Sequence, residues 1–164
     1  MTHTIPATLQ WRWTLRAGST AALGALIFVI QLYRGLGTTS DLDVWDIALS
    51  AAIACFLVTL LLWWLLIVRK QRLQAWRGVL TGGLVGLLGL PMTWYILALY
   101  FYATGAQSSL GQPTLNPLEA IFGSLILGLA SVYVVGWMTI PLGMLGGWLF
   151  FLLYRWRVLR ALGS

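Results

Sequence analysis

Hydrophobic residues fall in four long blocks that short polar segments separate. The blocks cover residues 17–33, 44–68, 78–103 and 118–154. Within them the apolar residues are continuous and do not alternate as in a β-strand. The hydrocarbon core of a bilayer is about 30 Å thick and needs about 20 helical residues to cross it. The pattern therefore predicts an all-α polytopic membrane protein, a bundle of four transmembrane helices.

The fourth block is too long for one crossing. As one continuous helix it would measure roughly 55 Å at 1.5 Å per residue. Pro141 lies inside it and has no N–H to donate to the carbonyl of Trp137, so the helix should kink there. A hairpin of two crossings would need a polar turn, and the stretch around Pro141 offers little. We therefore expect one crossing kinked at Pro141, with the surplus tilted or along the cytoplasmic interface; a partial re-entrant turn is the alternative.

The third block carries a similar proline, Pro91, after a series of glycines. Broken helices at matched positions of two halves can mark the binding site of a transporter. Here the prolines lie in the third and fourth blocks, and the two halves show no convincing repeat. Proline kinks are also common in ordinary membrane helices. The structural interpretation of both prolines is therefore favoured over a transport site.

Composition supports the membrane assignment. The chain of 164 residues is 60% hydrophobic and only 9% charged, whereas soluble domains carry about 25% charged residues. The net charge of +6 could indicate nucleic acid. The basic residues border apolar blocks, however, so we expect them to meet anionic lipid headgroups and not nucleic acid.

Charge also predicts the orientation. Of the ten Lys and Arg residues, all except Arg34 lie in the segments that flank one side of the predicted bundle. The positive-inside rule places this side in the cytoplasm, so both termini are expected there. The domain organisation is then a basic, aromatic N-terminal segment over 1–16, a transmembrane domain over 17–154 and a basic tail over 155–164. The four acidic residues, on the opposite side, are Asp41, Asp43, Asp46 and Glu119.

A helix start is recognisable before the fourth block. Asn116 is a suitable N-cap, and Pro117 has no N–H to leave unpaired at the first helical position. Glu119 suits the positive end of the helix dipole and the capping-box position. The fourth helix should therefore begin at Pro117.

Small residues recur every four positions in several blocks. In lipid such ladders let helix backbones approach closely. They predict either a tight bundle or docking against another membrane protein. The ladders are Ala17, Ala21 and Ala25 in the first block, Gly78, Gly82 and Gly86 in the third, and Ala120, Ser124 and Gly128 followed by Thr139, Gly143 and Gly147 in the fourth.

Reactive side chains are scarce. No Asp, Glu, Lys, Arg or His lies near the middle of a block, which argues against proton-coupled transport. His3 is the only histidine and Cys55 the only cysteine, so neither a metal site nor haem ligation by histidine is expected. No catalytic set of residues is present either. We predict no cofactor and no enzymatic activity; a bound lipid or pigment remains an open alternative.

Three functional hypotheses follow from these patterns. The first is an accessory, anchoring or assembly subunit of a larger membrane complex, with other membrane subunits as partners. The second is a small transporter or channel for a neutral or lipid-like solute, and a lipid-modifying enzyme ranks last. The short loops fit a bacterial inner membrane or a thylakoid-type membrane.

Overall fold

The computed structural model describes residues 7–35, 41–69, 74–105 and 116–162, and within them all regular structure is helical. Four helical segments are long and apolar enough to cross a membrane. The chain is therefore an integral, multi-pass membrane protein with an all-α transmembrane bundle. Its elements are α1 (Ala7–Gly35), α2 (Asp41–Trp63), the π-helical turn η1 (Trp64–Val68), α3 (Ala75–Thr104), α4 (Pro117–Ser131), the π-helical turn η2 (Val132–Gly136) and α5 (Trp137–Leu162).

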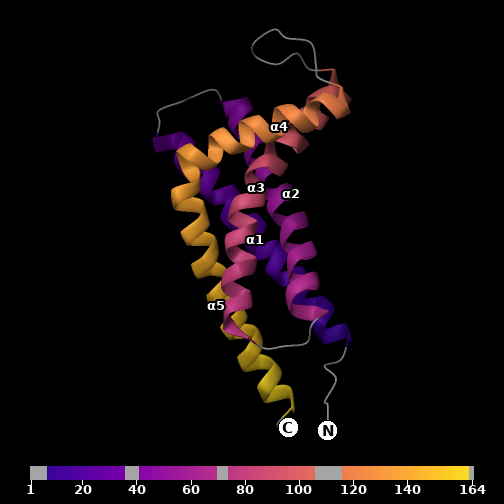
Figure 1. The fold of residues 1–164 in the computed structure, drawn as a ribbon, viewed down its shortest axis with the longest axis vertical. Helices are drawn as coiled ribbons and strands as arrows, with labels where there is room; N and C mark the ends of the chain where they lie inside the picture. The colour runs from indigo at the N-terminus through magenta and orange to yellow at the C-terminus, as the bar shows by residue number, and fades with distance from the viewer. Residues whose placement is uncertain (1–6, 36–40, 70–73, 106–115, 163–164) are drawn as a thin grey trace.

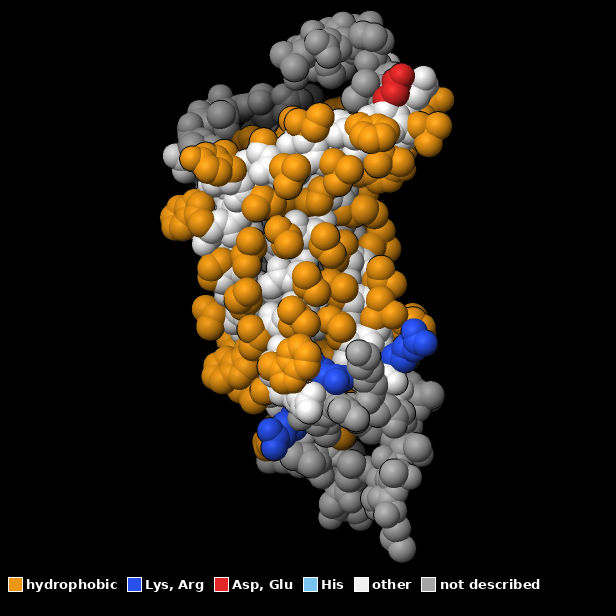
Figure 2. All heavy atoms as spheres, in the orientation of Figure 1, with side chains coloured by type: hydrophobic (Ala, Val, Ile, Leu, Met, Phe, Trp, Pro, Cys, Tyr) orange, Lys and Arg blue, Asp and Glu red, His pale blue; other side chains and the backbone are white. Residues whose placement is uncertain are grey.

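Four long helices run lengthwise and the shorter α4 lies across one end of them (Figure 1). The start of α1 and the end of α5 both lie at the other end of the bundle, as the charge pattern predicts for an even number of crossings. On the face drawn in Figure 2, the described Lys and Arg side chains gather near the chain ends, and a carboxylate lies at the start of α4. An apolar surface separates the two.

The helices at the chain ends extend beyond the apolar blocks. α1 begins at Ala7 and α5 continues to Leu162, so much of the predicted basic segments is helical. The reason is that hydropathy marks only the part of a helix that fits lipid, whereas the backbone hydrogen bonds continue into the interface.

The fourth block divides at η2 and not at the proline. α4 spans 15 residues, about 22 Å at 1.5 Å per residue, and only α5 crosses the bundle lengthwise (Figure 1). The sharp change of direction lies at η2, just before the predicted position, and Pro141 lies inside α5. Pro141 deprives the carbonyl of Trp137 of its helical donor, and Trp137 is the first residue after η2. The carbonyl that lacks a helical donor therefore directly follows the wide π turn at which the chain changes direction.

The position of the surplus residues of the fourth block also differs from the expectation. These residues form α4, which lies at the end opposite to the start of α1 and the end of α5, whereas we expected it near that basic end (Figure 1). The start of α4 agrees with the predicted cap. The backbone N–H of Asn116 donates to the carboxylate of Glu119 at 3.2 Å, and the N–H of Ala120 donates to the carbonyl of Asn116 at 2.8 Å.

The glycine ladders of α3 and α5 interlock. A Cβ added at Gly82 would meet the carbonyl of Gly143 on α5, and one added at Gly86 would lie 2.7 Å from the carbonyl oxygen of Thr139. Gly78 faces Gly147 in the same way, since its added Cβ would lie 2.8 Å from that carbonyl oxygen. These ladders therefore hold two antiparallel helices backbone to backbone inside one chain.

The remaining predicted small residues seat α4 on α3. A Cβ at Gly128 would collide with the ring of Pro91, so this proline is a packing partner within a continuous α3. Ser124 is buried nearby. One turn after Pro91, Trp94 donates its indole N–H to the hydroxyl of Ser131 at 2.8 Å. α3 therefore supports both α4 and the bend that follows it.

One basic residue is used inside the protein. Arg77, near the start of α3, is buried and donates from Nη1 to the carbonyl of Leu66 in η1 at 3.1 Å. A cation at the carbonyl end of a helix is favourable because it opposes the helix dipole. This contact ties the end of α2 and η1 to the next crossing.

Candidate functional site: an apolar cleft between α1 and α5

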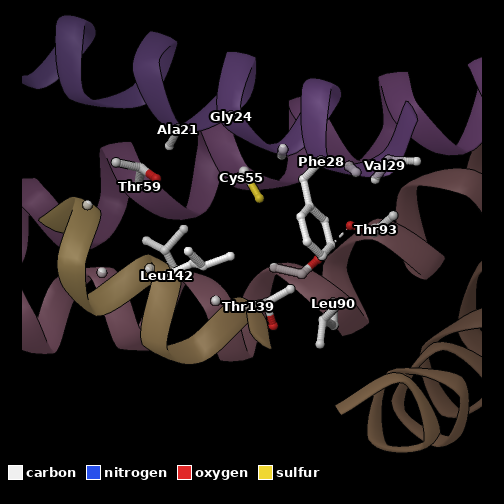
Figure 3. Close-up of a pocket in the computed structure, with 18 of the residues that line it drawn as sticks. Ala21, Gly24, Phe28, Val29, Cys55, Thr59, Leu90, Thr93, Thr139 and Leu142 are labelled. Atoms are coloured by element: carbon white, nitrogen blue, oxygen red, sulfur yellow. Dashed lines mark hydrogen bonds between the residues drawn. The ribbon is translucent and has the colours of Figure 1, made fainter. Parts of the chain in front are cut away.

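Helices α1 and α5 have no extensive interface along their lengths, although α2 packs on α1, α3 on α2 and α5 on α3. The chain of contacts therefore leaves a seam between the first and the last crossing. A cavity of about 760 Å³ lies in this seam. Its walls come from α1, α2, α3 and α5, and residues of α4 and η2 line it as well. Figure 3 shows α1 and α5 on opposite sides of the open space.

Small side chains explain why the seam is not filled. Ala21, Gly24 and Ala25 line it from α1, and Gly146 lines it from α5. A Cβ added at Gly24 or at Gly146 would meet nothing within 4 Å. The neighbouring Gly18, in contrast, is in close contact with Phe56 of α2. α1 thus packs closely at Ala17 and Gly18, while Ala21, Gly24 and Ala25 border the unfilled space.

Aromatic rings close the end of the cleft that lies near the start of α1 and the end of α5. Trp13 of α1 and Trp63 of α2 each make edge-on contacts with both Phe150 and Tyr154 of α5. The ring centroids are 5.2–5.8 Å apart, within the range of favourable aromatic pairs. We call these four residues the aromatic floor. The floor is where α1 and α5 are joined.

We expect Trp13→Ala to loosen the aromatic floor. Trp13 is buried and contacts two rings of α5, and removing a buried Trp side chain typically costs about 3–5 kcal/mol of stability. The change should be visible as a lower midpoint of unfolding in mixed micelles. The exposed Trp11, on the same helix, is the control, because Trp11→Ala removes no floor contact. Equal losses for both variants would contradict the role of the floor.

The wall of the cleft is apolar and carries no ionisable group other than thiol and phenol. None of the lining residues is Asp, Glu, Lys, Arg or His, and the described part of the chain contains no cluster of potential metal ligands. The ring of Phe28 and the sulfur of Cys55 extend into the space (Figure 3). Such a site suits a neutral, mostly hydrocarbon ligand, because a charge there would stay uncompensated.

Comparison with protein families, with characterised proteins and with solved structures found no match for this chain. The chemistry of the cleft is therefore the basis for a functional assignment.

The predicted site residues lie in and behind one wall of the cleft. Gly82, Gly86, Gly143 and Gly147 line it in addition to joining α3 and α5. Gly78 packs against Gly147 and Phe151 of α5 and does not line the cleft. The other predicted residues outside the lining are Pro91, Ser124, Gly128 and Pro141. Sequence reasoning missed Gly24, Phe28, Thr59 and Gly146. The sequence did contain a signal for Gly146. This glycine lies next to Gly147 but outside the four-residue ladder of Thr139, Gly143 and Gly147, so helix packing does not explain it.

Proposed function

We propose that this protein is a non-catalytic membrane protein that takes up a neutral, lipid-like molecule from the bilayer into the cleft between α1 and α5. The observation that supports the proposal is the cleft itself: a large apolar cavity bounded by crossing helices. A lateral seam gives a molecule in the hydrocarbon layer access without passage through water. The proposal is a form of the second functional hypothesis, a small transporter or channel for a neutral or lipid-like solute.

The volume of the cleft suits a single small molecule. Ligand cavities usually measure about 300–1,000 Å³, and this one holds about 760 Å³. One acyl or prenyl chain fits the available space.

The basic end of the bundle gives the proposed sidedness. Arg12, Arg16, Arg155 and Arg157 are exposed there, so we place this end in the cytoplasm against anionic headgroups. The aromatic floor then closes the cleft on the cytoplasmic side, and α4 crosses the opposite end. A bacterial inner membrane or a thylakoid-type membrane is the proposed location.

An accessory subunit of a larger complex is the second candidate. It draws support from α4, whose outward side chains include Leu118, Phe122 and Ile126, exposed by 77%, 72% and 69%. A helix at an interface usually has a polar face, so a covering protein would account for these residues. The α3–α5 ladders give this candidate no support, because they are occupied within the chain. Co-purification with larger membrane proteins in mild detergent would favour it.

The proposed uptake can be tested with a photoactivatable ligand. The protein is reconstituted in vesicles with a diazirine-bearing methyl palmitate, irradiated and digested, and the labelled residues are mapped. We expect labelling on the cleft wall, at Phe28 and Leu142, that excess unlabelled methyl palmitate suppresses. Labelling at the bilayer-facing Leu23, exposed by 60% and outside the lining, should not be suppressed. The proposal would be contradicted if the competitor suppressed labelling neither on the cleft wall nor at Leu23, or suppressed it equally at both.

A further inference from the structure

Helical threonines of this protein usually satisfy their hydroxyl groups on their own helix. Thr14, Thr81 and Thr93 donate to the carbonyl four residues earlier at 2.7–2.9 Å. Thr20 and Thr104 do the same at 2.8 Å. This is the ordinary arrangement in lipid, where no water is available to a hydroxyl.

Two threonines depart from this arrangement. The hydroxyl oxygens of Thr59 on α2 and Thr139 on α5 are buried and have no hydrogen-bond partner. The indole N–H of Trp63, one turn after Thr59, has none either. All three residues line the cleft, and Thr59 and Trp63 are 5% and 2% exposed. Figure 3 shows the Thr59 hydroxyl directed into the open space.

These three groups have one requirement in common. The indole N–H can only donate, and a threonine hydroxyl can donate or accept. A buried polar group without a partner is unfavourable, and more so in a hydrocarbon environment. A hydrogen-bond acceptor is therefore the one kind of partner that could pair with each of the three groups.

We infer that the bound molecule carries an acceptor oxygen, as a carbonyl, ester or ether, on its hydrocarbon body, and that this oxygen accepts a hydrogen bond from the hydroxyl of Thr59, with Trp63 and Thr139 as the other unpaired donors of the cleft wall. The inference rests on the proposed function and names the ligand class of the same cleft. A carboxylate is excluded from this class because no cationic side chain lines the cleft to compensate it. The ligand is a neutral ester, ketone or ether lipid.

The test compares chain-matched competitors of the photolabel. Methyl palmitate, hexadecane and palmitate differ in the head and share the chain. For the unmodified protein we expect methyl palmitate to suppress labelling of the cleft at a concentration about threefold to tenfold lower than hexadecane. Palmitate at a pH where it is ionised should be the weakest competitor.

Substitutions then identify the residue that donates to the acceptor oxygen of the ligand. Thr59→Val keeps the branched shape but removes the hydroxyl, so it should remove most of the preference for the ester and leave competition by hexadecane unchanged. Unchanged hexadecane competition also shows that the variant is folded. Thr93→Val is the matched control, because Thr93 lines the same cleft but its hydroxyl already bonds to the carbonyl of Gly89. This control should keep the full preference.

The outcomes separate the two proposals. If hexadecane and methyl palmitate compete equally in the unmodified protein, the inference is overturned and uptake into the cleft stands. An ester preference that survives in Thr59→Val, Thr139→Val and Trp63→Phe alike also overturns it. If neither compound suppresses labelling, uptake itself fails and the inference fails with it.

Discussion

Gly82→Ala is expected to destabilise the bundle by about 3 kcal/mol or more, at the upper end of overpacking effects. The added Cβ meets the carbonyl of Gly143 and lies 3.1 Å from the Cα of Gly147. All the atoms it meets belong to backbone, which cannot rotate away as a side chain can. The change therefore forces α3 and α5 apart over the central part of their contact.

The measurement is the midpoint of unfolding by a denaturing detergent in mixed micelles, followed by circular dichroism. Gly146→Ala is the control, because a Cβ there meets nothing within 4 Å and alanine is the better helix former by about 1 kcal/mol. Its stability should be equal or higher. If Gly82→Ala is as stable as Gly146→Ala, the backbone contact between α3 and α5 is refuted.

Gly24→Phe and Gly146→Phe are expected to reduce specific photolabelling of the cleft by at least about tenfold, a loss of roughly 1.4 kcal/mol or more in binding. Each glycine lines the cavity and faces free space, so a phenyl ring can occupy the site of the ligand without a clash. The two residues lie on opposite walls, α1 and α5. The same result from both would identify the space between them as the binding site.

Leu23→Phe is the matched control for Gly24→Phe. Leu23 is the adjacent residue on α1, faces the bilayer and lies outside the lining, so its substitution should leave labelling of the cleft unchanged. Unfolding midpoints of all three variants should stay near that of the unmodified protein. A folded Gly24→Phe that retains full competitive labelling would argue against binding in the cleft.

Some local features follow from short stretches of sequence because their causes are local. The helix start at Pro117 depends on Asn116 and Glu119, three residues apart, and the structure confirms it. The bend in the fourth block was expected because its length exceeds one crossing. Its position at η2 depends on how α4 is held, by Gly128 on Pro91 and by Ser131 on Trp94. Those partners come from another helix, so the sequence around Pro141 could not place the bend.

The sequence by itself determined the four crossings, the shared side of the chain ends and the small residues that allow close packing. These properties depend on the distribution of apolar and charged residues along the chain, because apolar stretches partition into the hydrocarbon core and basic segments stay on one side of it. It did not determine which small residues meet a helix and which bound a cavity. In a soluble protein burial would separate the two, but in lipid the interior and exterior of a bundle are equally apolar.

Only the tertiary structure decided that Gly82 meets Gly143 while Gly24 and Gly146 face an unfilled space. It alone joined Trp13, Trp63, Phe150 and Tyr154 into a floor from three helices. It also left the hydroxyl of Thr59 without the helical partner that other threonines have. Each of these features depends on how the helices pack against one another, and no single segment of the sequence decides that packing.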